Sequence, residues 1–147
     1  MMNSKIGRLY LVASEKGLQG VFWKKQPVPI KETKILSTAV RQLEQYLDGK
    51  RKAFDLPLDV QGTAFQKLVW NELSRIPFGK TYSYKEIAAK IKNAKAFRAV
   101  GTANGKNPLC IIVPCHRVIA ADGSLGGYSG GLATKTKLLG LEQKAAR

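Results

Sequence analysis

A proline divides the aliphatic segment IIVPCHRVIA, residues 111–120, and limits how this part of the chain can fold. Proline lacks a backbone N–H and keeps the preceding residue extended, so a strand that enters this segment has to end where Cys115 begins. Three functional groups then follow one another at a chain turn: the thiol of Cys115, the only imidazole of the chain at His116, and the guanidinium of Arg117. These basic neighbours predict a lowered pKa for the Cys115 thiol, which favours the nucleophilic thiolate.

The order of these residues along the chain does not by itself make His116 the base for Cys115. Consecutive side chains of a strand point to opposite faces, so the imidazole reaches the thiol only if the chain twists or a water bridges them. Four acidic residues follow residue 60, and Glu142 is the best candidate to orient the imidazole because it lies in an apolar C-terminal segment. The alternative is an inert, buried Cys115.

The two cysteines, Cys110 and Cys115, are predicted to be reduced. The Ile- and Val-rich segment that holds them indicates a strand, in which their Cα atoms would lie roughly 17 Å apart. A disulfide tolerates only about 4.4 to 6.8 Å between Cα atoms, so we expect none. One histidine and two cysteines without a CxxC pair also make a poor zinc site, and we expect neither a metal nor a cofactor.

Positive charge is concentrated in the second half of the 147-residue chain. The net charge is +15, of which residues 1–60 contribute +5 and residues 61–147 contribute +10. A chain this basic is drawn to polyanions, because neutralised phosphates release their counterions. A solvated basic face is the alternative interpretation, so charge alone does not establish nucleic-acid binding.

The composition predicts a folded protein of the cytoplasm. Hydrophobic residues make up 44% of the chain, which argues against a disordered tail. No apolar run approaches the roughly 20 residues that cross a bilayer, and the run near the N-terminus is shorter than the about 7 to 15 residues of a secretory signal. We therefore expect no membrane association.

Residues 1–60 are predicted to form a small α/β unit. RLYLVAS and LQGVFW, at 8–14 and 18–23, alternate apolar and polar residues around a short turn and indicate a β-hairpin. Apolar side chains recur at helical intervals over 34–47, and Gly49 is a suitable stop. The charged segment that follows places the domain boundary near residue 60.

Residues 61–147 are predicted to form a mainly helical second domain. Thr63 is suited to cap a helix over 64–76, and Ser83 opens the capping box SYKE for a helix through about residue 91. A turn at KNA then leads to another short helix, so the pair has the pattern of a helix-turn-helix.

The second helix of this pair combines cations with small residues. Lys95, Arg98, Thr102 and Lys106 recur on one face, and small side chains allow close approach of a partner: Ala96, Ala99, Gly101, Thr102 and Ala103. A tightly packed core helix is the alternative. The cations favour DNA as the partner.

Three segments of this chain, NPLCIIVPCHRVI, RAVGTANGKN and GGYSGGLATK, resemble the active-site and DNA-binding segments of O6-alkylguanine-DNA alkyltransferases. RLYLVASEKGLQGVFW is similar to the N-terminal β-hairpin of that family. The resemblance covers essentially the whole chain. It implies an α+β fold, with a small N-terminal α/β domain containing an antiparallel sheet and then a helical C-terminal domain with a winged-helix-like helix-turn-helix.

The resemblance also implies the chemistry. Cys115 would accept the alkyl group from O6 of guanine irreversibly, in a single turnover. His116 would act as the base through water, and Glu142 would orient it. Asn107 matches the asparagine that braces the turn before the active site, and Tyr84 matches the tyrosine whose hydroxyl supports the leaving guanine at N3.

The same resemblance implies contacts with double-stranded DNA that contains O6-alkylguanine, with the target base rotated out of the helix. Arg98 would fill the vacated stack, and the Val118 carbonyl would accept from the guanine amino group. The remaining residues implied in DNA and substrate binding are Lys95, Ala99, Gly101, Thr102, Tyr128, Ser129 and Gly130. The protein is expected to be a monomer in solution, and cooperative binding along DNA is left open.

The chain departs from the family at Phe97, where a small residue or proline is expected.

Three other functions fit the sequence less well. An alkylated-DNA sensor of the same fold carries tryptophan where this chain has Cys115. A cysteine hydrolase has no need of a basic helix rich in small residues. A purely structural DNA-binding domain leaves the PCHR and YSGG segments unexplained.

Overall fold

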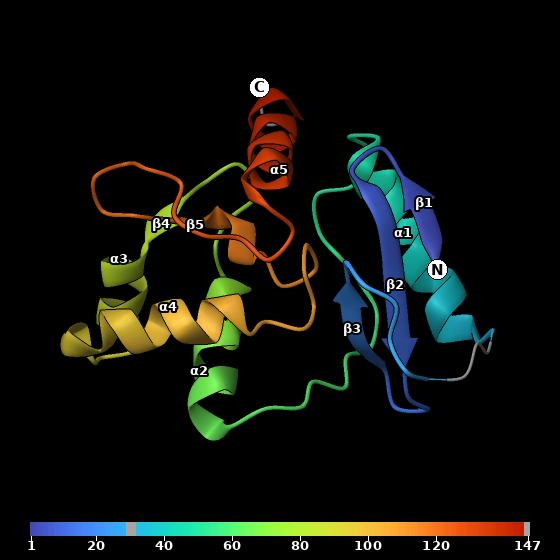
Figure 1. Ribbon diagram of the computed structural model, residues 1–147, viewed down its shortest axis with the longest axis horizontal. Helices are drawn as coiled ribbons and strands as arrows, with labels where there is room; N and C mark the ends of the chain where they lie inside the picture. The colour runs from blue at the N-terminus through green and yellow to red at the C-terminus, as the bar shows by residue number, and fades with distance from the viewer. Residues whose placement is uncertain (29–31, 146–147) are drawn as a thin grey trace.

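The computed structural model describes residues 1–28 and 32–145, which form two units side by side (Figure 1). The N-terminal unit has an antiparallel sheet in the order β1-β2-β3, with the strands Met2–Ser4, Gly7–Ala13 and Leu18–Phe22. The predicted hairpin is therefore confirmed. The first strand was not predicted, because three residues are too few to show an alternating pattern.

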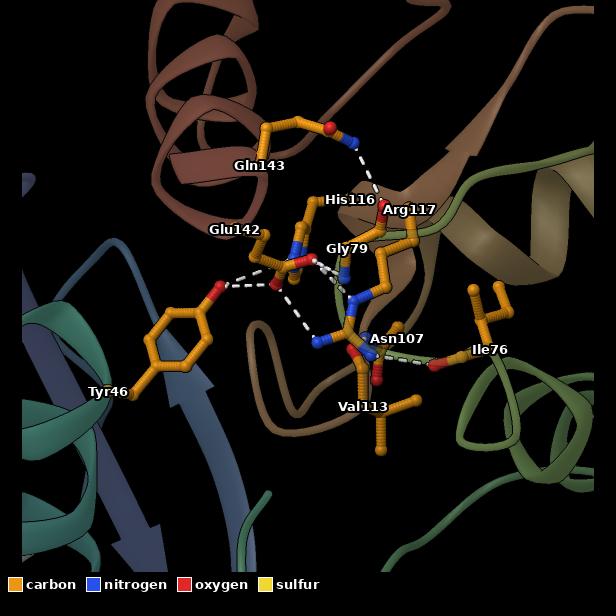
Figure 2. Close-up of polar contacts among 9 residues, drawn as sticks. All are labelled: Tyr46, Ile76, Gly79, Asn107, Val113, His116, Arg117, Glu142 and Gln143. Carbon is orange, nitrogen blue, oxygen red and sulfur yellow. Dashed lines mark hydrogen bonds and ion pairs between the residues drawn. The ribbon is translucent and has the colours of Figure 1, made fainter. Parts of the chain in front are cut away.

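Helix α1, Lys34–Leu47, packs against this sheet and agrees with the predicted range. Thr33 begins it by accepting a hydrogen bond from the Leu36 amide at 3.2 Å. Gly49 follows its end with a φ of +76°, as expected of a residue that stops a helix. The buried face of α1 includes Tyr46, which points toward the second unit (Figure 2).

The second unit is mainly helical, as predicted, and the whole fold is α+β. Its helices are α2 Ala64–Leu73, α3 Tyr84–Lys90, α4 Phe97–Gly105 and α5 Leu132–Ala145, with short 3-10 turns η1 Ala94–Ala96 and η2 Cys115–Arg117. Strands β4 Tyr82–Ser83 and β5 Val118–Ile119 pair in parallel. The capping boxes opened by Thr63 and Ser83 are both present. Helices α3 and α4, packed against each other, form the predicted helix-turn-helix.

The strand predicted to hold Cys110 and to end at Cys115 is wrong, because residues 109–113 form a compact turn. Ile111 has a φ of +75°, and the Val113 amide donates to the Leu109 carbonyl at 2.9 Å. Asn107 stabilises the turn, since its side chain donates to the Val113 carbonyl and accepts from the Leu109 amide. A side chain that satisfies both backbone groups locally competes with strand pairing.

This turn overturns the prediction that the two cysteines lie far apart. The thiols of Cys110 and Cys115 lie close enough to influence each other's ionisation, and both are buried and free of a disulfide. The turn also joins the two units, because the Val21 amide of β3 donates to the Pro108 carbonyl at 2.8 Å. The acceptor candidate Cys115 therefore lies just beyond the contact between the units.

No helix within residues 1–28 and 32–145 is long and apolar enough to cross a membrane.

Candidate functional site

Cys115 begins the turn η2 and lies in the wall of a cavity of about 330 Å³. The thiol residue is only 3% exposed. The cavity lies between the α3–α4 pair and the glycine-rich loop, residues 123–131, that precedes α5. Its lining residues are Tyr84, Gly101, Asn104, Gly105, Cys115, Gly127, Tyr128 and Ser129. Of the residues predicted to act on a substrate, Cys115, Tyr84, Gly101, Tyr128 and Ser129 thus meet around one space.

His116 is fully buried, and its hydrogen bond shows which ring nitrogen carries the proton in the neutral imidazole. Its Nε2 lies 2.7 Å from Glu142 Oε2, a pair drawn in Figure 2. Because an ionised carboxylate only accepts, Nε2 carries the proton and Nδ1 has a free lone pair. Nδ1 has no protein partner among the described residues. Burial lowers the pKa of His116, and Arg117 and Lys135 act in the same direction against Glu142, so the imidazole is neutral near pH 7.

Glu142, on α5, is the centre of the polar network behind the thiol. Arg117 binds it at two points, with Nε 2.8 Å from Oε1 and Nη2 2.9 Å from Oε2. Burial alone would raise the pKa of Glu142, but hydrogen bonds from His116 and Arg117 outweigh it and lower the pKa from 4.5 to about 2. The carboxylate is therefore ionised and its charge is balanced by the guanidinium.

The prediction that the surroundings lower the pKa of Cys115 is wrong. The neighbouring thiol of Cys110 and burial raise the pKa of Cys115, while Asn107 and Lys135 act in the opposite direction. Arg117 does not stabilise a thiolate, because its guanidinium binds Glu142 and the Ile76 carbonyl instead. Cys115 is therefore a neutral thiol near pH 7, and its activation needs a base.

Tyr84 lines the cavity together with Cys115, whereas Asn107 lies in the turn that leads to Cys115. Tyr84 begins α3 and is half-buried beside the cavity, where burial and the nearby Cys115 raise the pKa of its phenol. The hydroxyl is therefore protonated and can donate. Asn107 is buried in the turn before η2 and fixes the backbone that leads to the thiol.

The glycine-rich loop covers the cavity from the side of α5. Ser129 lies with its Oγ 3.4 Å from Cys110 Sγ. The rings of Tyr128 and Trp23 meet edge to face with 6.0 Å between their centroids. Gly130 lies directly against Trp23, since a Cβ there would come within 2.5 Å of the indole. The N-terminal unit thus supports this loop.

The predicted DNA-facing residues are arranged around α4. Lys95, Arg98, Ala99 and Thr102 are exposed, whereas Gly101 faces the cavity. Phe97 is half-buried, and its ring centroid lies 5.5 Å from Lys85 Nζ and 5.9 Å from the Arg98 guanidinium carbon. The aromatic ring is therefore packed under two cations.

Sequence reasoning missed three residues of this site, Tyr46, Cys110 and Lys135. Tyr46 reaches Glu142 from the other unit, and Cys110 contacts Cys115 through the unexpected turn. Lys135 is completely buried, and its Nζ donates to the carbonyls of Leu125, of Gly127 at 3.2 Å and of Val118 at 2.6 Å. A lysine in the sequence LATKTK gives no local signal of burial, because exposure is the usual state of lysine.

Val118 accordingly shares its carbonyl with Lys135. A carbonyl oxygen has two lone pairs, so one remains for a further donor. Within the described ranges, no three residues of the His, Cys, Asp and Glu types come together to hold a metal ion.

Comparison with known proteins identifies the family. Residues 1–60 match the family described as 6-O-methylguanine DNA methyltransferase, ribonuclease-like domain, and residues 64–144 match its DNA binding domain. The methylated-DNA–protein-cysteine methyltransferase of Methanosarcina barkeri is 47% identical over 100% of this chain and 98% of its own length. The inducible enzyme of that name from Bacillus subtilis is 43% identical over 95% of this chain and 81% of its own length.

A solved structure shows the same arrangement of elements. Mycobacterium tuberculosis OGT in complex with DNA is 45% identical and superposes with a TM-score of 0.90, over 98% of this chain and 91% of that one. The matches together span both units. The chain belongs to the 6-O-methylguanine DNA methyltransferase family.

Proposed function

We propose that this protein repairs DNA by moving the alkyl group of O6-alkylguanine, above all methyl, onto Cys115 in one irreversible step. The observation that carries the proposal is a buried thiol in a cavity wall, followed by a neutral histidine whose Nδ1 is free and whose Nε2 binds Glu142. The names of the curated relatives support the same reaction. We propose further that the chain divides near residue 60 into a scaffold domain, 1–60, and a DNA-binding and transfer domain, 61–147.

In the transfer step, the Cys115 proton passes through a bridging water to Nδ1 of His116, and the thiolate sulfur attacks the alkyl carbon. A carbon–sulfur bond forms as the bond from that carbon to O6 breaks. The electron pair stays on the guanine, which leaves as its anion or takes up one proton. No redox partner is needed, and the thioether that remains has no leaving group, so the protein reacts once.

Tyr84 supports the departing base. Its phenol is kept protonated by burial, so it can donate a hydrogen bond to guanine N3 as negative charge develops there. We assign the Ser129 amide a similar part near O6, and the second lone pair of the Val118 carbonyl to the guanine amino group. The carbonyl is held in place by Lys135.

Binding would place α4 against duplex DNA and the target base in the cavity. The exposed cations Lys95 and Arg98 suit contacts with phosphates and with the vacated stack, and Ala99, Gly101 and Thr102 leave room for close approach. The glycine-rich loop would close over the extruded base. Affinity should fall steeply with salt because phosphates are neutralised.

The direct test is the intact mass of the protein after incubation with excess duplex DNA carrying O6-methylguanine. One added methyl group per chain, absent in Cys115→Ser, is the expected result. An unchanged mass together with tight DNA binding would instead indicate a lesion sensor. An undiminished gain in Cys115→Ser would assign the acceptor to another residue.

Titration of the same duplex followed by sedimentation gives the number of chains bound. Single, independent binding is expected for a protein that acts as a monomer, and a steep dependence on protein concentration would mean that binding is cooperative.

A further inference from the structure

The hydroxyl of Tyr46 enters the transfer site from the N-terminal unit. It donates to Glu142 Oε2 at 2.5 Å and lies 3.5 Å from His116 Nε2. In Figure 2, Tyr46 approaches Glu142 from α1, opposite the side from which Arg117 approaches. The tyrosine is completely buried. A side chain 96 residues away from Glu142 in sequence therefore shares the oxygen that binds the histidine.

The proton positions follow from the ionisation states. Glu142 has no proton to donate, because its pKa is lowered to about 2. Burial and the negative charge of Glu142 raise the pKa of the Tyr46 phenol. The tyrosine therefore keeps its proton and donates a hydrogen bond to Glu142. Oε2 accordingly accepts from Tyr46, His116 and Arg117, while Oε1 accepts from Arg117 and, at 3.4 Å, from the Gly79 amide.

Aromatic packing fixes where the hydroxyl lies. The ring of Tyr46 packs against Phe54 at 5.6 Å between centroids and meets Phe78 at 6.2 Å with an interplanar angle of 84°. Phe78 belongs to the C-terminal unit, so the ring is held from both sides of the contact between the units. The donor cannot turn away from Glu142 without disturbing this packing.

We propose that Tyr46 is a positioning residue for alkyl transfer: its hydroxyl fixes the Glu142 carboxylate in the orientation that keeps His116 Nδ1 available to Cys115. The N-terminal unit thereby takes part in the chemistry of the C-terminal unit. The kinetic side of this proposal rests on the proposed function, while the effect of Tyr46 on the imidazole can be measured without substrate.

Removal of the hydroxyl should strengthen the interaction of Glu142 with the imidazolium. Glu142 and Arg117 face His116 at its Nε2 side, Lys135 acts from α5, and the Tyr128 ring lies edge to face at 6.5 Å. When Tyr46 no longer shares Oε2, the charged imidazolium gains a better acceptor and becomes easier to form. Protonation of His116 removes the base, so the transfer rate should fall at a higher pH than in the unmodified protein.

The first experiment is a nitrogen-15 NMR titration of His116, whose signals need no assignment because it is the only histidine of the chain. The unmodified protein should show a neutral ring with the proton on Nε2. Tyr46→Phe keeps the ring packing and should raise the pKa of His116 by about 0.5 to 1 unit. The matched control is Tyr10→Phe, at a half-buried tyrosine of β2 outside the site, and it should leave the titration unchanged.

The second experiment measures single-turnover methyl transfer from O6-methylguanine duplex across pH. Tyr46→Phe should slow transfer by about tenfold near pH 7, which is a part of the roughly 10² to 10⁴ that a positioned base supplies. The pH below which the rate declines should be higher in Tyr46→Phe than in the unmodified protein. Tyr10→Phe should leave both the rate and its pH dependence unchanged. In a Glu142→Gln background the same Tyr46→Phe change should have no further effect on the rate.

These outcomes separate the two proposals. Normal transfer with an unchanged histidine titration in Tyr46→Phe overturns the positioning role and leaves the proposed function standing. A shifted titration in a protein that never takes up methyl overturns the function alone. Should Tyr46→Phe unfold, Phe54→Leu takes its place, because it removes a ring that holds Tyr46. A raised pKa of His116 in Phe54→Leu supports the positioning role, and an unchanged pKa overturns it.

Discussion

Arg117 and Glu142 form a two-point ion pair in the protein interior, where both side chains are almost completely buried. Removal of one member leaves the other charge buried without its partner, which costs about 3 to 5 kcal/mol. We expect Arg117→Met to lower the free energy of unfolding by this amount, as measured by urea denaturation.

The control for this prediction is the exposed pair Lys5–Asp48, whose charged atoms lie 3.5 Å apart. Solvent screens such a pair, so Lys5→Met should change the free energy of unfolding by less than about 1 kcal/mol. Equal losses in the two variants would show that burial does not decide the energy of the Arg117 pair.

Acid should destabilise the protein in two ranges of pH. His116 has a lowered pKa in the folded protein, so below its ordinary value of 6.5 the unfolded chain binds more protons and stability falls. Glu142 stabilises the fold fully above 4.5, and its contribution is lost as the pH falls toward 2. Urea denaturation from pH 8 to pH 3 measures both. His116→Gln should remove the first decline, and a flat profile in the unmodified protein would contradict the assignment.

The contact between Gly130 of the glycine-rich loop and Trp23 predicts that one added methyl group lowers the stability of the protein. A Cβ at Gly130 would lie 2.5 Å from the indole and 2.9 Å from the Tyr128 ring, so Gly130→Ala should displace the loop and lower stability by about 1 to 3 kcal/mol. A Cβ at Gly140, on α5, would have no atom within 4 Å beyond its own helix, and Gly140→Ala should instead stabilise the helix by up to about 1 kcal/mol. Thermal unfolding compares the two variants directly.

Cys110 should control how readily Cys115 ionises. The neighbouring thiol of Cys110 is the largest cause of the raised pKa of Cys115, so Cys110→Ala should lower that pKa. The measurement is the pH dependence of Cys115 alkylation by iodoacetamide, followed by peptide mass. A Cys115 profile that stays in place or moves to higher pH in Cys110→Ala would contradict the prediction.

Local sequence signals predicted most of the fold. The capping residues Thr63 and Ser83, the apolar period of α1 and the alternation of the hairpin each act within a few residues, so they can be recognised without knowledge of the remaining chain. The strand predicted before Cys115 was wrong. The aliphatic composition of this segment favours a strand, whereas the Asn107 side chain closes a turn there.

The sequence by itself determined that a thiol and an imidazole are neighbours after a proline, and it singled out Glu142 as the carboxylate to test. Only the tertiary structure decided the electrostatics. Arg117 binds Glu142, Cys110 and burial raise the pKa of Cys115, and Tyr46 and Lys135 are buried among residues far away in the chain. The physical reason is that pKa values and buried hydrogen bonds depend on which groups pack together, and distant packing leaves no periodic pattern in the sequence.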